Sequence, residues 1–123
     1  MANMLASTRE ELKLQLANAG LTVFDYVPER ITPPVAVLEP GSPYVGSGET
    51  FCEFEITFNV VLFAATGTNE VATAELDQFI CTVLDQVHTF HLESVATPSS
   101  FEVSNAVYLG TRITFTTMKD LTV

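Results

Sequence analysis

Two histidines and two cysteines are the side chains of this chain with the most distinctive chemistry. His88 and His91 lie three residues apart, and a zinc site would need one or two further ligands at defined spacings. Neither Cys52 nor Cys81 is near them in sequence. We therefore interpret His88 as a cation at a helix end and His91 as a turn residue, and we predict no metal site. Cys81 beside a histidine would suggest a nucleophile, but its place within an apolar helix favours the core.

Other catalytic patterns are weak or missing. Gly41, Gly46 and Gly48 lack the lysine and helix that complete a phosphate-binding loop, and no Gly-x-Ser-x-Gly motif occurs. Asp25 and Tyr26 would supply an acid and an oxyanion donor to a small pocket, but both are common residue types. No motif supports catalysis, and the polar groups do not converge on one site. A small-ligand-binding module, with Asp25, Tyr26 and a pocket under the second helix, stays open as an alternative.

The strongest strand pattern covers residues 51–64. Its even positions are apolar from Cys52 to Leu62, whereas its odd positions include two glutamates, a threonine and an asparagine. Successive side chains of a strand point to opposite faces, so one face packs on a core and the other meets water or a partner. At about 3.3 Å per residue the strand spans roughly 46 Å, which exceeds the ~35 Å diameter of a compact domain of this size. It must bend, break or protrude.

The odd face of this strand is the first candidate site. Glu53 and Glu55 point the same way, Thr57 and Asn59 lie beyond them, and Arg112 lies on the polar face of the last strand. Where the two strands pair, Arg112 would contact Glu53 or Glu55. We predict that these five residues line a subunit interface or a lumen. The alternative is an ordinary solvated face.

The segment 40–48 is the second candidate site. It contains three glycines, two prolines and two serines, which predicts a loop. Because function concentrates on such segments, we take Gly41, Ser42, Tyr44 and Val45 as candidate partner-contact residues. Tyr44 either forms an exposed anchor for a partner or folds back on the core.

The elements that position these residues follow from local patterns. Ser7 and Glu10 resemble a capping box, which together with Gly20 predicts a helix over 8–19. We expect strands over 21–26, 35–38 and 51–64, a helix over 71–87, a weaker strand over 92–96, and an antiparallel pair or one bent ribbon over 101–106 and 107–118. The chain is therefore expected to be one α+β domain over 1–123, a mainly antiparallel β-sheet with two α-helices packed on one face. The expected order is α-β-β-β-α-β-β.

Composition limits the function further. Five basic residues stand against fifteen acidic ones, the net charge is −10, and apolar residues make up 47% of the 123 residues. Such a chain is too apolar for disorder and too acidic to bind nucleic acid by neutralising phosphates. No apolar run approaches the ~20 residues that cross a bilayer, and no basic leader segment is found. We expect a cytosolic protein, away from membranes, whose cysteines are buried free thiols.

The order of motifs along the chain points to a family. Within residues 17–44, a helix ending in Ala19-Gly20 is followed by Asp25-Tyr26-x-Pro28, a Pro33-Pro34 strand and a Pro40-Gly41-x-Pro43-Tyr44 loop. The long alternating strand, a helix with Leu76-Asp77-x-x-Ile80 and a last strand with Gly110-Thr111-Arg112-Ile113-Thr114-Phe115 come next. Over the whole chain this order resembles the tail terminator proteins of long-tailed bacteriophages, especially those that infect actinobacteria.

That resemblance implies a structural virion protein that is not an enzyme and uses no cofactor. The family forms a hexameric ring that caps the tail tube, ends tube polymerisation and joins the tail to the head. The implied partners are other copies of the chain, the tail tube protein and a head completion or connector protein, while DNA passes through the lumen without specific binding. The implied location is the head-proximal end of the virion tail, after assembly in the host cytoplasm. A head–tail connector adaptor or stopper protein is the near alternative.

Overall fold

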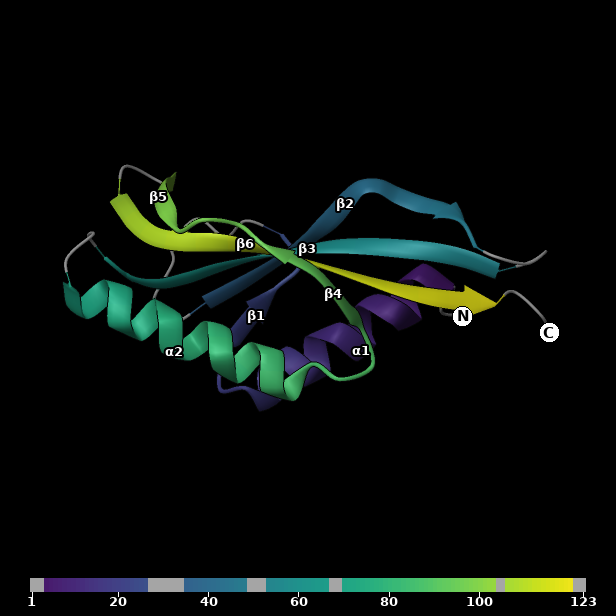
Figure 1. The fold of residues 1–123 in the computed structure, drawn as a ribbon, viewed down its shortest axis with the longest axis horizontal. Coiled ribbons are helices and arrows are strands. Elements are labelled where there is room, and N and C mark those ends of the chain that lie inside the picture. Colours follow the sequence, from purple (N-terminus) through teal and green to yellow (C-terminus); the bar gives the residue numbers. More distant parts are fainter. Residues whose placement is uncertain (1–3, 27–34, 49–52, 67–69, 104–105, 121–123) are drawn as a thin grey trace.

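The computed structural model describes residues 4–26, 35–48, 53–66, 70–103 and 106–120, and it has the predicted α+β class (Figure 1). The helices are α1 (Met4–Asn18) and α2 (Glu70–Gln86). The strands are β1 (Thr22–Phe24), β2 (Val35–Ser47), β3 (Glu53–Thr66), β4 (His91–Val95), β5 (Ser99–Val103) and β6 (Ala106–Asp120). One more strand than predicted follows the second helix, because β4 and β5 pair separately with β6.

The described strands form one sheet in the order β1-β2-β3-β6-β4, and β5 also pairs with β6. β1 runs parallel to β2, whereas the other ladders are antiparallel, so the sheet is mainly antiparallel as predicted. β3 curves along its length, which is how the sheet accommodates so long a strand (Figure 1). Bulges accompany the curvature, one between Phe63 and Ala65 of β3 and one between Pro40 and Val45 of β2.

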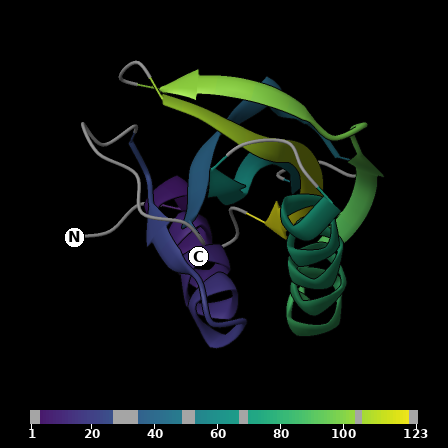
Figure 2. The same ribbon diagram turned by 90° about the vertical axis from the view of Figure 1, so that its left-hand side faces the viewer.

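Both helices pack on the same face of the sheet, which confirms the predicted layers (Figure 2). The alternation in β3 explains this arrangement, since its even positions from Ile56 to Leu62 all face the helices and are at most 1% exposed. The core between the two layers also draws large apolar residues from α1, α2, β2 and β6: Leu12, Leu16, Leu76, Val83, Leu38, Ile113 and Phe115.

A second apolar cluster lies on the other face of the sheet. We call this the open face, because neither of the two described helices covers it (Figure 2). The cluster consists of Val35, Val37, Val61, Phe63 and Tyr108. The β5 strand adds Phe101, whose ring meets that of Phe63 edge-on at 5.5 Å. The open face is therefore partly apolar, and Phe101 and Val103 of β5 pack against that part.

The beginning of α1 differs from the prediction, whereas its end agrees with it. The helix starts at Met4, so Ser7 and Glu10 lie inside it and do not form a capping box. Thr8 is buried instead, and its hydroxyl donates to the Met4 carbonyl at 2.7 Å, as threonines inside helices do. Gly20 follows the helix with φ of 88°, the left-handed conformation that we predicted there.

The predicted loop over 40–48 is wrong, because β2 continues through it to Ser47. The bulge between Pro40 and Val45 absorbs the residues that do not fit the ladder. Tyr44 folds back on the core: it is half-buried, its ring lies 5.6 Å from that of Phe58, and its hydroxyl accepts a hydrogen bond from Arg9 at 2.9 Å. Tyr44 therefore fastens β2 to α1 and is not an exposed anchor.

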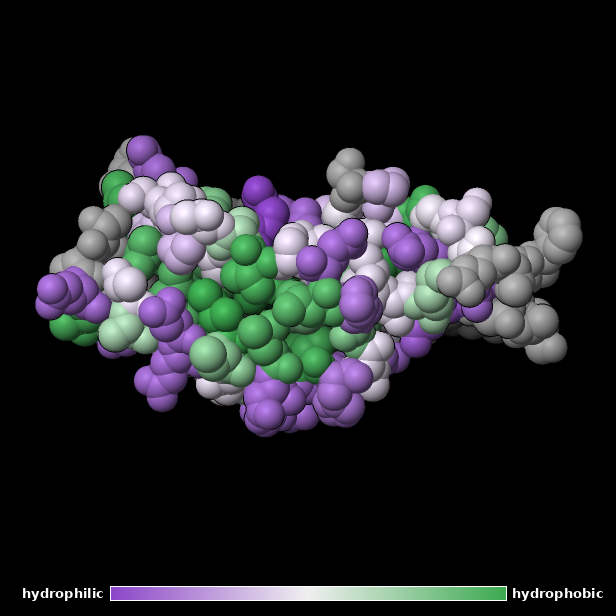
Figure 3. All heavy atoms as spheres, viewed as in Figure 1, coloured by the Kyte–Doolittle hydropathy of each residue, from purple (hydrophilic) through white to green (hydrophobic). Residues whose placement is uncertain are grey.

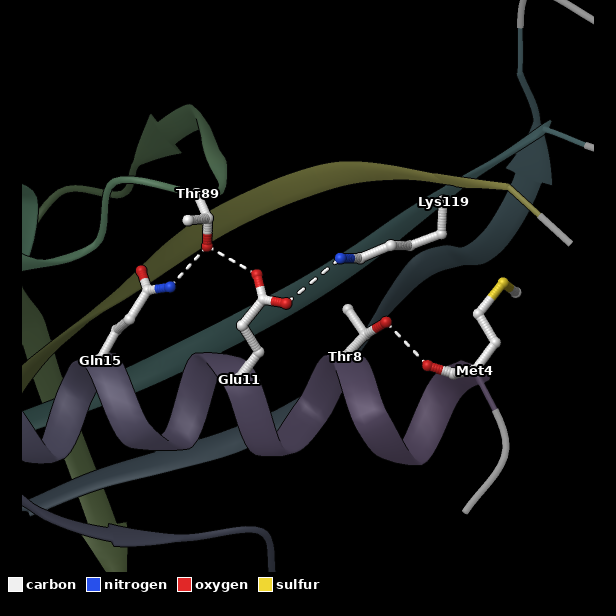
Figure 4. Close-up of polar contacts among 6 residues, drawn as sticks. All are labelled: Met4, Thr8, Glu11, Gln15, Thr89 and Lys119. Carbon is white, nitrogen blue, oxygen red and sulfur yellow. Dashed lines mark hydrogen bonds and ion pairs between the residues drawn. The ribbon is translucent and has the colours of Figure 1, made fainter. Parts of the chain in front are cut away.

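A chain of polar contacts joins α1 to the rest of the fold (Figure 4). Gln15 and Glu11 both bind the hydroxyl of Thr89, which follows α2, and Thr89 donates to Glu11 at 2.6 Å. The Lys119 ammonium of β6 lies 3.2 Å from the other Glu11 oxygen. The Thr89 hydrogen bond lowers the pKa of Glu11, partial burial opposes this effect, and Lys119 lowers the pKa further.

Glu11→Gln is expected to lower the free energy of unfolding at neutral pH by about 0.5–1 kcal/mol, because the pair with Lys119 is partly exposed. The folded pKa lies below the ordinary value of 4.5, so the carboxylate stabilises the fold above that pH and ceases to do so as the pH falls through the folded pKa. Urea titrations of the unmodified protein and the Glu11→Gln variant should therefore give free energies of unfolding that converge as the pH is lowered through the acid range. Glu10→Gln is the control, since Glu10 is 69% exposed; an equal effect there would contradict the role of Glu11.

Candidate functional site

All five residues predicted for a subunit interface or lumen lie on the open face. Glu53, Glu55, Thr57 and Asn59 occupy successive odd positions of β3, and Arg112 of β6 stands opposite Val61, which is also odd. Their surroundings differ along the strand. Glu55 is exposed and Asn59 is half-buried, whereas Thr57 is only 6% exposed. The alternation of β3 thus gathered the candidates on one face, although they do not form one cluster.

The predicted contact between Arg112 and Glu53 or Glu55 is wrong. The β3–β6 register places Arg112 six residues beyond Glu55, or about 20 Å along the strand. The guanidinium instead pairs with Glu39 of β2, with 3.1 Å between Nε and Oε1. Glu39 was not predicted as a site residue, yet the alternation of Val35, Val37 and Glu39 would have placed it on this face.

The middle of the open face is a polar row in which the side chains bind one another. Thr114 donates a hydrogen bond to Asn59 at 2.9 Å, and Glu39 and Asn59 are neighbours across the β2–β3 ladder. Beside them Arg112 pairs with Glu39. Among the described residues no buried side-chain nitrogen or oxygen lacks a partner. The polar side chains of the row are thus engaged mainly with one another.

A hollow of about 240 Å³ adjoins the polar row. Its walls are mostly apolar, its rim carries Glu39, Glu102 and Arg112, and it is lined by Val37, Val61, Phe63, Phe101 and Val103. Pockets for drug-sized ligands usually measure about 300–1,000 Å³, so this hollow suits a protruding side chain of another protein better. Phe101 and Val103 were not predicted as site residues.

The alternative ligand site gains no support from the structure. Asp25 is exposed and lies 3.7 Å from Lys13, and Tyr26 is 62% exposed. Neither residue lines the hollow beside Arg112, nor a second one of about 290 Å³ near Glu55 and His91.

The residues with the most distinctive chemistry are dispersed. The ring nitrogen Nδ1 of His88 lies 2.8 Å from the Gln86 carbonyl, and His91 begins β4, so it is not the turn residue that we predicted. The predicted burial of Cys81 is wrong, because it lies on the solvent side of α2, and Cys52 lies outside the described residues. Within the described ranges, no three His, Cys, Asp or Glu side chains gather where they would hold a metal ion.

Positive charge on the described surface is already engaged within the chain. Arg9 binds Tyr44, Lys13 lies near Glu10 and Asp25, Arg112 pairs with Glu39, and Lys119 pairs with Glu11. The α2 helix carries four acidic residues and no lysine or arginine. The outward field of the protein is therefore negative, as its net charge of −10 requires.

Comparison with known proteins adds no assignment: no family model and no curated protein matches this chain. None of the described helices is long and apolar enough to cross a membrane.

Proposed function

We propose that this chain is a structural subunit that assembles into a ring and serves as the tail terminator of a long-tailed phage. The observation that carries the proposal is the composition of the open face. Along the sheet it changes from the apolar hollow through the polar row to the acidic end at Glu53 and Glu55. This face has the properties of a contact surface and lacks converging reactive groups.

The asymmetry of the open face favours a ring over a symmetric dimer. In a twofold dimer the patch must complement itself, because residue i contacts residue j and j contacts i. About an axis through the polar row, the acidic end of one copy would meet the apolar hollow of the other, which is a poor match because carboxylates would be buried without a partner. In a ring each subunit presents one surface to the next and a different surface to the previous one, and rotation closes the assembly. A hollow that fits a protruding side chain suits such a head-to-tail contact.

The terminator role rests on the resemblance of the motif order, and the fold is compatible with it. Such a ring caps the tail tube, ends its polymerisation and joins it to the head, with the tube protein and a head completion protein as partners. Glu53 and Glu55 would line the lumen or the contact between subunits. An acidic lumen repels phosphate, so DNA would pass through without binding.

The ring is tested by light scattering and negative-stain imaging of the purified chain in high salt, which screens repulsion between acidic subunits. We expect closed rings of about six times the 13.4 kDa protomer mass. Val103→Asp places a charge in the hollow and is expected to give monomers. Val107→Asp is the matched control on the same hairpin, because Val107 is 44% exposed and does not line the hollow. A monomer at every concentration, or rings that Val103→Asp leaves intact, would contradict the proposal.

A further inference from the structure

An apolar strip runs between α2 and β4 on the edge of the molecule, and we call it the α2–β4 strip (Figure 3). Leu84 of α2 is 37% exposed and Leu92 of β4 is 38% exposed. Ile80 and Val95 of the same two elements are half-buried and pack against the main core. Figure 3 shows the apolar side chains of this region as one patch, with hydrophilic side chains along its α2 border.

The topology of the sheet explains why this strip is uncovered. β4 is the outermost strand on its side and pairs with β6 alone among the described strands. Leu92 and Val95 stand opposite Phe115 and Ile113, so they point to the helix face. The α2 helix packs chiefly on β3, nearer the middle of the sheet. No described element therefore forms a layer over the side of α2 that carries Leu84 or over the outer edge of the sheet.

The Asp, Glu, Lys and Arg side chains of α2 and β4 are all acidic: Glu70, Glu75, Asp77 and Asp85 in α2, and Glu93 in β4. At about 100° per residue, Asp77 lies on the Leu84 side of α2 and Asp85 lies beside Leu84, whereas Glu75 lies on the opposite side. Glu93 follows Leu92 in β4. The described lysines and arginines lie on α1 and β6, where each is engaged with another side chain. An apolar strip between carboxylates complements a segment with apolar side chains on one side and basic side chains beside them.

We propose that the α2–β4 strip binds a positively charged amphipathic helix of another protein. The apolar side of such a helix would cover Leu84 and Leu92, and its lysines or arginines would face Asp85 and Glu93. A second copy of this chain is a poor occupant, because it would bring further acidic groups to the strip. Edge pairing of two β4 strands is also disfavoured, since β4 is short, bulged and charged at Glu93.

This binding does not depend on the proposed ring, because it uses none of the open-face residues. It would give the protein a surface for a basic partner in either assembly state. Failure of the ring and failure of this binding are separable, since the first is read from particle mass and the second from peptide affinity.

The test uses the full chain and three synthetic peptides of about 15 residues, a length at which isolated helices begin to be stable. The first has leucines at helical spacing with lysines on its other side, the second replaces every lysine by glutamate, and the third scrambles the first. Fluorescence anisotropy should detect binding of the lysine peptide alone. Raising salt from about 0.1 M to 1 M, which shortens the screening length from about 10 to 3 Å, should weaken it.

Leu84→Ser with Leu92→Ser removes the apolar strip and leaves every charge in place. We expect at least about ten-fold weaker binding of the lysine peptide, equivalent to about 1.4 kcal/mol. Val71→Ser is the matched control, because Val71 is 66% exposed on the same helix and points away from Leu84 by helical geometry. It is expected to change nothing, and far-ultraviolet circular dichroism would verify the fold of each variant.

Several results would overturn the proposal. They are equal binding of the scrambled or glutamate peptide, no binding of any peptide, or unchanged affinity of the double variant. A concentration-dependent dimer of the unmodified chain that the double variant abolishes would show that a second copy occupies the strip.

Discussion

Replacing Phe58 by alanine is expected to lower the free energy of unfolding by about 3–5 kcal/mol, as for other buried phenylalanines. Phe58 is 1% exposed and faces both helices from the central strand β3. It stands opposite Phe115 of β6, and its ring meets that of Tyr44 edge-on. Its removal would therefore leave a cavity where three strands and the helix layer meet, and it would loosen the Tyr44 contact that fastens β2 to α1.

Urea denaturation followed by circular dichroism measures this loss. Phe101→Ala is the matched control, because Phe101 is the same residue type but only half-buried on the open face. Phe101→Ala should lower the free energy of unfolding clearly less than Phe58→Ala does. Equal costs at the two positions would mean that the helix-side core does not dominate the stability of the fold.

Gly110→Ala is the second substitution with a large expected effect, a loss of about 1–3 kcal/mol from overpacking. A β-carbon at this position in β6 would lie 2.6 Å from the Leu62 carbonyl oxygen and 3.1 Å from the Phe101 ring. The backbone oxygen cannot move without disturbing the central ladder. The ring of Phe101 contacts that of Phe63 diagonally across Gly110. Because Gly110 has no side chain, it leaves room for β5 to pack over the open face.

Gly46→Ala makes the same chemical change in β2 and serves as the control. A β-carbon there has no heavy atom within 4 Å, so the variant should be neutral or more stable by up to about 1 kcal/mol. Thermal unfolding of both variants would separate the clash from the general effect of replacing glycine in a strand. A Gly110→Ala protein as stable as Gly46→Ala would show that Phe101 does not pack over β6 as described.

The sequence predicted best where one period runs through a whole element. The two-residue alternation of β3 identified the core face from Ile56 to Leu62. The apolar stripe of α2 predicted both ends of that helix to within one residue. Gly20 was predicted correctly because a left-handed residue after a helix is a local requirement of the backbone. These signals are contained within one element.

The failures arose where distant parts of the chain decide the outcome. Residues 40–48 have the composition of a loop, but pairing with β3 and a bulge make them part of a strand. Helix α1 extends four residues before its expected start at residue 8, since tertiary packing of Met4 and Leu5 outweighs the local cap. The placement of the five candidate residues on one face was predicted correctly. The contact between Arg112 and Glu39 was not, because it depends on both the β2–β3 and the β3–β6 registers, which join strands far apart in sequence.

The position of β6 has a consequence for how the protein is made. β6 is last in chain order, yet it pairs with β3 along one edge and with β5 and then β4 along the other. On the ribosome, β3, β4 and β5 are therefore all synthesised before the strand that joins them. The sheet cannot close until β6 emerges, so the nascent chain leaves one edge of β3 unpaired until then.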